Sequence, residues 1–167
     1  MTEGFEQATE ITVLGIGNIV LRDEGFGVRV AEYLTAHYTF PAKVQVLDGG
    51  TLGMELLRFV EGTKRLLLLD AVRGDKAPGE TYRLAGAEVA AHFQDKLSAH
   101  EIGIQDILTL LTLTGKPVPD VVVLGAEPVD LSAGMALSPA LSALVPEMAQ
   151  RAVEELALWG VAAEKKA

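Results

Sequence analysis

Hydrophobic positions along the chain alternate between short continuous runs and longer segments in which apolar side chains recur every three or four residues. Runs of this length suit strands buried in a sheet, and the periodic segments suit amphipathic helices. The pattern predicts strands at 11–14, 43–47, 66–69, 81–84 and 121–124, and helices at 26–38, 52–60, 87–93, 98–111 and 139–159. Because strands alternate with helices, we expect an α/β fold: a single three-layer α/β/α domain with a largely parallel, twisted central sheet of about five strands.

The same pattern divides the chain into one domain with short ends. Residues 1–10 form a polar N-terminal extension, residues 11–160 form the domain, and residues 161–167 form a tail that is expected to fray. A ligand site in a parallel sheet lies beyond the carboxyl ends of the strands. The residues expected at those ends are 18–24, 48–51, Asp70 and 127–128.

Composition and charge exclude several function classes. The 167 residues carry 23 acidic against 14 basic side chains, a formal net charge of −9, which disfavours nucleic acid as a partner. The chain has no cysteine, so disulfides and a cysteine nucleophile are excluded. No apolar run approaches the length of a spanning helix and no signal peptide is recognised, so we expect a cytoplasmic protein without a membrane partner.

The stretch ITVLGIGNIVLRDEGFGVRV, residues 11–30, predicts a strand, a glycine-rich turn and a helix. A G-x-G turn after a strand suggests a dinucleotide site, but Val20 stands where the third glycine is expected. The helix start offers two carboxylates instead. Asp23 is a candidate N-cap, and Glu24 is placed in the first turn, where the helix dipole favours its charged form. Both residues could equally serve only to begin the helix.

Glu24, Asp70 and His100 are the polar side chains that could act together. Two carboxylates and an imidazole form a plausible set of three ligands for a divalent transition metal. The S-x-x-E capping box that begins at Ser98 places His100 in the first turn of a helix. In the alternative interpretation these are a helix-start charge, a strand-end residue and an exposed helix residue.

The remaining candidates are weaker. His37, near the end of a helix, and His92, in a short amphipathic helix, are predicted to be surface or structural residues. The chain has no G-x-S-x-G elbow and no H-E-x-x-H helix, so the usual serine-hydrolase and zinc-protease signatures are missing.

Four motifs in order resemble the [NiFe]-hydrogenase maturation endopeptidases, and the resemblance extends from residue 11 to residue 159. The motifs are GIGNIVLRDEGFGVRV, the DGGT turn at 48–51, LLLLDAV around Asp70 and SAHEIG at 98–103. The resemblance implies a processing protease that removes a short C-terminal peptide from the nickel-loaded precursor of a [NiFe]-hydrogenase large subunit. The form SAHEIGIQDIL looks most like members that process uptake-type hydrogenases.

The resemblance also implies roles for individual residues. Glu24, Asp70 and His100 match the metal-contacting residues of the family, and Asp48 matches an aspartate linked to substrate or nickel recognition. Gly49, Gly50 and Thr51 complete that turn and are expected to shape the substrate groove.

The nickel is expected to be carried by the precursor, held mainly by the precursor's own cysteine thiolates. Other divalent ions such as cadmium or zinc are expected to be able to occupy the site in vitro. Glu24 or Asp70 could also act as general base for a water molecule, so the activity is expected to be aspartic-type or metal-dependent.

Three other functions remain open at this point. The same fold could serve as a nickel-dependent chaperone that binds the precursor without cutting it, or as a nucleotide-binding domain that uses the turn at Gly15 and Gly17. A general aminopeptidase is also possible, although two-metal enzymes of that class usually need more carboxylates and histidines than this chain offers.

Overall fold

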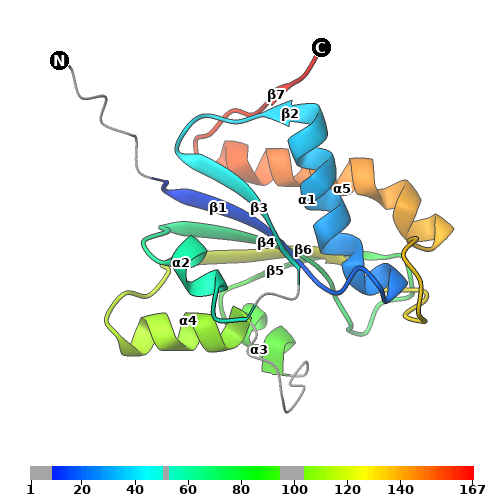
Figure 1. Cartoon of the computed structure of the whole chain (residues 1–167), viewed down its shortest axis with the longest axis horizontal. Helices are drawn as coiled ribbons and strands as arrows, with labels where there is room; N and C mark the ends of the chain where they lie inside the picture. Colours follow the sequence, from blue (N-terminus) through cyan, green and yellow to red (C-terminus); the bar gives the residue numbers. More distant parts are fainter. Residues whose placement is uncertain (1–8, 51–52, 95–103) are drawn as a thin grey trace.

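The computed structural model describes residues 9–50, 53–94 and 104–167 (Figure 1). Its main feature is a five-stranded sheet with the order β3-β1-β4-β6-β5, in which all neighbouring pairs are parallel except β5 and β6. The strands are β1 (Ile11–Ile16), β3 (Val44–Gly50), β4 (Arg65–Ala71), β5 (Thr81–Ala85) and β6 (Asp120–Ala126). The five predicted strands and the largely parallel sheet are therefore confirmed.

Helices cover both faces of the sheet, as Figure 1 shows. One face packs against α1 (Phe26–His37) and α5 (Pro139–Leu158), and the other against α2 (Leu56–Val60), α3 (Ala87–Gln94) and α4 (Ile104–Leu113). Successive residues of β4 alternate between the two cores: Leu67 and Leu69 face the first, and Leu66 and Leu68 face the second. A strand that is apolar at every position therefore has to lie in the middle layer, which confirms the three-layer prediction.

Glycines let α1 lie directly on the strands. A Cβ atom at Gly27 would overlap the carbonyl oxygen of Leu69, and one at Gly17 would overlap the carbonyl oxygen of Glu24. Gly17 also has a φ of 126°, a conformation that favours glycine. A Cβ atom at Gly15, in β1, would likewise overlap the carbonyl oxygen of Gly27. Both glycines of the G-x-G pattern therefore permit close backbone packing within the chain, and the pattern needs no dinucleotide to explain it.

Several boundaries differ from the predictions, including the start of α2 at Leu56 instead of residue 52, and two differences arise from pairing between distant segments. Strand β3 continues through Asp48, Gly49 and Gly50, which the sequence assigned to a turn. Gly15 pairs with Asp48 and Ile16 with Gly50, so a bulge leaves Gly49 as the extra residue. The tail predicted to fray contains β7 (Glu164–Lys165), which pairs antiparallel with β2 (Tyr38–Thr39). Both pairings join segments that a local pattern cannot relate.

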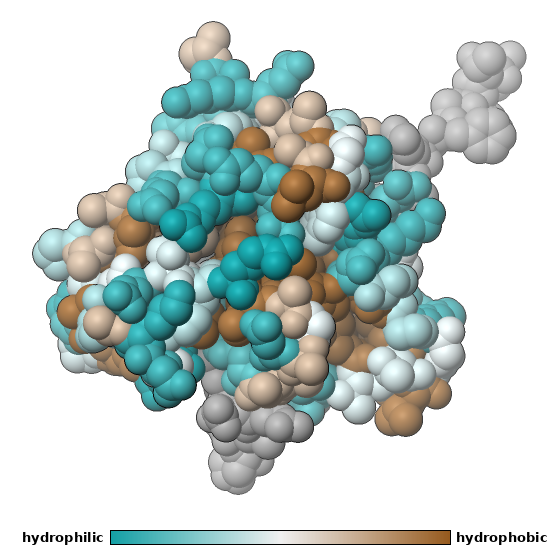
Figure 2. Space-filling view, turned by 180° about the vertical axis from the view of Figure 1, so that it is seen from behind, coloured by the Kyte–Doolittle hydropathy of each residue, from teal (hydrophilic) through white to brown (hydrophobic). Residues whose placement is uncertain are grey.

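The surface is mixed in character. Figure 2 shows the face opposite to that of Figure 1, on which hydrophobic residues form small patches between hydrophilic ones. In the part of the chain that the structure describes, no helix is both long and apolar enough to cross a membrane.

Candidate active site

Two of the three predicted metal ligands lie in adjoining segments at the carboxyl edge of the sheet. Asp70 is the penultimate residue of β4 and is only 2% exposed, and Glu24 lies half-buried in the short 3-10 helix η1 (Arg22–Gly25). Helix η1 is in contact with β4, and Gly27, one turn further on, packs on the backbone of Leu69 and Asp70. The two carboxylates therefore belong to adjoining segments.

His92 contacts Asp70 directly, a role that the sequence did not indicate. Its Nε2 atom lies 3.4 Å from Oδ2 of Asp70, and both side chains are 3% exposed. His92 follows Val89 by three residues and precedes Phe93, and all three are buried, so helical spacing alone could have placed His92 on the inner face of α3. His37, by contrast, is exposed at the end of α1, as predicted.

The third predicted ligand, His100, and the predicted substrate residue Thr51 lie outside the described residues. Within the described part of the chain, no three His, Cys, Asp or Glu side chains are grouped closely enough to hold a metal ion. A three-ligand metal site therefore stays a prediction.

Asp48 lies at the same edge of the sheet as Glu24. Its side chain is exposed where β3 ends, and the bulge beside it continues into Gly50, which has a φ of 44°. The carbonyl of Gly50 accepts a hydrogen bond of 3.1 Å from the backbone N–H of Gly17. Because Gly17 packs on the backbone of Glu24, the end of β3 and η1 are joined through a single residue.

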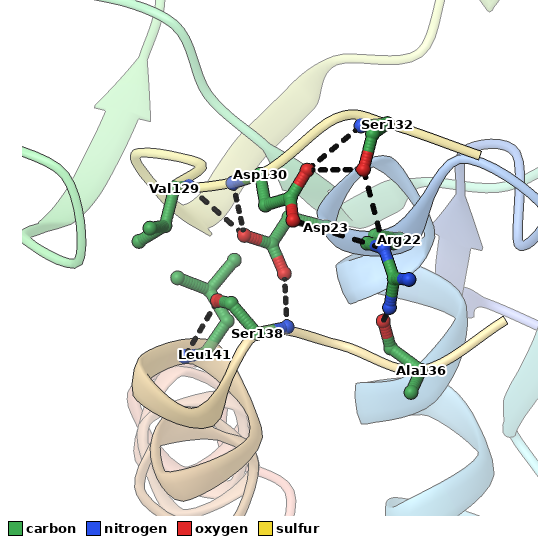
Figure 3. A network of polar contacts seen from close by, with 8 residues as sticks. All are labelled: Arg22, Asp23, Val129, Asp130, Ser132, Ala136, Ser138 and Leu141. Atoms are coloured by element: carbon green, nitrogen blue, oxygen red, sulfur yellow. Dashed lines mark hydrogen bonds and ion pairs between the residues drawn. The ribbon is translucent and has the colours of Figure 1, made fainter. Parts of the chain in front are cut away.

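Asp23 does not cap a helix, contrary to the prediction. It lies inside η1, α1 begins at Phe26 as predicted, and neither helix has a side-chain cap. The fully buried Asp23 carboxylate accepts three backbone N–H hydrogen bonds, from Val129 and Asp130 at 2.9 Å and from Ser138 at 2.7 Å (Figure 3). These charge-assisted bonds attach the loop between β6 and α5 to η1.

Arg22 strengthens the same connection from the surface side. Its φ of 46° turns the chain so that its guanidinium Nε donates to Oγ of Ser132 at 3.3 Å and lies 3.7 Å from Asp130 (Figure 3). Hydrogen bonds from the Ser132 hydroxyl and backbone hold the pKa of Asp130 below its ordinary value. Backbone hydrogen bonds of 2.9 Å join Arg22 and Val20 to Gly134. The loops after β1 and β6 therefore form one unit.

The loop after β4 is attached by Glu127, which follows β6. Oε2 of Glu127 accepts hydrogen bonds of 2.9 Å from the Tyr82 hydroxyl and from the backbone N–H of Gly74. The Tyr82 oxygen in turn accepts the N–H of Lys76 at 2.9 Å. Burial is the main reason that the pKa of Tyr82 is raised. Two loops thus meet at the end of β4, beside Asp70.

Comparison with known proteins identifies the family. The family model described as hydrogenase maturation protease matches residues 28–155. The chain is 38% identical over 154 residues to the Hydrogenase 2 maturation protease of Escherichia coli (strain K12), covering 92% of this chain and 94% of that protein. It is 37% identical to the hydrogenase expression/formation protein HupD of Rhodobacter capsulatus, covering 94% of this chain and 76% of that protein.

Solved structures agree with the sequence relatives. The hydrogenase maturating endopeptidase HybD from E. coli superposes with a TM-score of 0.88 at 37% identity, covering 95% of this chain and 98% of that one. The [NiFe] hydrogenase maturation protease HybD from Thermococcus kodakarensis shares the fold, with a TM-score of 0.69 at 24% identity, covering 89% of this chain and 99% of that one. The chain therefore belongs to the hydrogenase maturation proteases, a family of peptidases.

Proposed function

We propose that the protein is the endopeptidase that removes a short C-terminal peptide from the nickel-loaded precursor of a [NiFe]-hydrogenase large subunit. The observation that carries the proposal is the placement of Glu24 and Asp70 in adjoining segments at the carboxyl edge of the sheet. The proposal is also supported by the match to the E. coli Hydrogenase 2 maturation protease, which covers nearly the whole length of both chains.

Nickel enters this proposal as part of the substrate. The precursor's thiolates hold the ion, and Glu24, Asp70 and His100 offer it oxygen and nitrogen ligands at its open positions. Without the ion, the two carboxylates would approach each other and the precursor as uncompensated negative charges, which disfavours binding. The metal thus acts as the feature by which a finished precursor is recognised.

The hydrolytic step needs a base for the attacking water. Glu24 or Asp70 can take the proton, because a carboxylate near the scissile carbonyl is a suitable general base. The His92 contact favours one orientation of the Asp70 carboxyl group, which suits a group that must be held in place before substrate arrives.

The test is to incubate the purified protein with a large-subunit precursor, with or without nickel, and to measure the precursor's mass. Loss of a C-terminal peptide only from the nickel-loaded form supports the proposal. Cleavage regardless of nickel contradicts nickel recognition but keeps the protease, whereas binding without cleavage favours the chaperone alternative.

Two variants connect the test to the site. Glu24→Gln and Asp70→Asn remove one charge each with little change in shape and should abolish cleavage. Asp75→Asn, an exposed residue of the loop after β4, is the matched control and should cleave normally. Normal cleavage by both site variants would contradict the proposed role of the carboxylates.

A further inference from the structure

Exposed hydrophobic side chains are not scattered evenly over this protein. Among the described residues six large ones are exposed, and four of them follow the carboxyl ends of strands: Val20, Met54, Val129 and Met135. The other two, Leu113 and Leu158, end α4 and α5 at the opposite edge of the sheet. Single exposed apolar residues are ordinary, but a group around one strand edge is typical of a contact surface.

Three of the four belong to the unit formed by the loops after β1 and β6. We call Val20, Val129 and Met135 the apolar rim; their exposed fractions are 49%, 50% and 56%. The Val20 carbonyl accepts a hydrogen bond from the backbone N–H of Gly134, the neighbour of Met135, and the backbone N–H of Val129 donates one to the Asp23 carboxylate. The rim is therefore held in a fixed arrangement before any partner binds, which lowers the entropy cost of binding.

The charges next to the rim are neutralised within the protein. Arg22 pairs with Asp130 at 3.7 Å, and Arg29 pairs with Glu32 at 3.2 Å while donating to the carbonyl of Met135 at 3.1 Å. In a chain whose net charge is −9, this leaves a locally compensated surface. Such a surface suits apolar side chains better than a strongly charged partner.

The rim is also continuous with the candidate active site. Val20 precedes η1 by two residues, η1 carries Glu24, and η1 contacts the strand that ends beside Asp70. A polypeptide bound at the two carboxylates can extend from there onto the rim. Met135 suits a contact surface of this kind, since the flexible side chain of methionine adapts to apolar groups of different shape.

We infer that the apolar rim binds apolar side chains of the precursor segment that flanks the scissile bond. This inference rests on the proposed function, because it names the part of the same substrate that the site would hold. The rim would then contribute to substrate affinity and take no part in the chemical step.

The test compares two double variants that make the same kind of change at opposite edges. Val20→Ser with Met135→Ser alters the rim, and Leu113→Ser with Leu158→Ser is the matched control. For the rim variant we expect KM for the nickel-loaded precursor to rise about tenfold. The fall in kcat should be much smaller, and the melting temperature should stay near that of the parent, because these side chains are exposed. The control should keep the parent's KM.

A conservative variant guards against an indirect effect. Val20→Leu with Met135→Leu keeps the surface apolar and should keep KM near the parent value. An unchanged KM in the serine variant, or an equal rise in the control, would overturn the inference. So would a rim variant that loses only self-association in sedimentation, since the rim would then join two copies of this chain.

Binding of the precursor is measured beside cleavage, so the two proposals can fail separately. If the parent binds without cleaving, the protease assignment fails and the rim is judged by the dissociation constants of the same variants. If the parent cleaves and the rim variant binds as tightly as the parent, only the rim inference fails. A parent that neither binds nor cleaves overturns both.

Discussion

At the scale of single residues, Asp23 illustrates how a buried charge is retained. Its carboxylate has no exposed surface, yet it accepts three backbone N–H groups from a loop more than a hundred positions away. A buried anion is tolerated when hydrogen bonds replace the water it has lost. The residue therefore stabilises the loop unit that carries the rim.

Replacing Asp23 tests this role. Asp23→Ala leaves three backbone donors without their acceptor, and we expect the free energy of unfolding to fall by about 3 kcal/mol. Urea denaturation measures the change, with Asp75→Ala as an exposed control that should alter stability by less than about 0.5 kcal/mol. Equal stability of both variants would mean that water satisfies the freed donors.

His92 is a second residue at this scale, and its proposed role depends on one contact, the hydrogen bond to Asp70. We expect His92→Leu, which keeps the volume but removes the hydrogen bond to Asp70, to lower kcat about tenfold with little change in KM. His92→Gln keeps a hydrogen-bond donor and should recover part of the rate. An unchanged kcat in the leucine variant would show that Asp70 is oriented by other contacts.

At the scale of elements, the loops that follow β4 and β6 are each held in place by a side chain from another segment. Asp23 holds the loop after β6, and Glu127 with Tyr82 holds the loop after β4. A site made from several strand ends gains a defined shape when its loops are attached in this way. The sheet itself supplies the fixed platform.

Tyr82 offers a test of the second attachment through pH. Burial raises the pKa of its phenol in the folded state, so the folded protein keeps the proton to a higher pH than the unfolded chain. The stability that this proton contributes is complete below about pH 10 and is lost as the pH rises through the folded-state pKa.

Tyr82→Phe removes this titration. We expect the variant to be less stable than the parent at pH 8, because the bonds to Glu127 and Lys76 are gone, and to lose less stability between pH 8 and pH 11. Urea denaturation at the two pH values measures both effects. Tyr33→Phe, at a half-buried position of α1, serves as the control, and its stability should change with pH as that of the parent does. An equal loss of stability between pH 8 and pH 11 in Tyr82→Phe and in the parent would contradict this prediction.

At the scale of the whole molecule, the two ends of the sheet carry different features. The carboxyl edge carries Glu24, Asp70 and the apolar rim, whereas the opposite edge holds the end of α1, where β2 pairs with β7. Lys166 extends that pairing with a backbone hydrogen bond of 2.8 Å to His37 and a side-chain bond of 2.9 Å to Thr35. This edge is expected to contribute stability only.

Removing the last residues tests whether the edge that holds β2 and β7 contributes to stability alone. A chain ending at Val161 loses β7 but keeps the buried Val161, and we expect its free energy of unfolding to fall by about 1–2 kcal/mol. Its kcat and KM should equal those of the full chain. A clear loss of activity in the shortened but folded protein would show that the tail reaches the site.

The layered fold follows from local sequence patterns: continuous apolar runs in the strands and start signals in the helices. Every position from Leu66 to Leu69 is apolar, so β4 had to be buried on both faces, and Pro139 is suited to the first position of α5. These signals depend only on neighbouring residues, so they are visible without knowledge of the segments that pack against each element.

The sequence by itself therefore determined the strands, the layers and, through its motifs, the family. Only the tertiary structure decided that Asp23 binds a distant loop, that His92 turns inward to Asp70, that β3 continues through Gly50 and that the tail pairs with β2. Each of these depends on a contact between segments far apart in the chain. Local periodicity reports which side of an element is buried, but the identity of the atoms found there is set by how the elements pack.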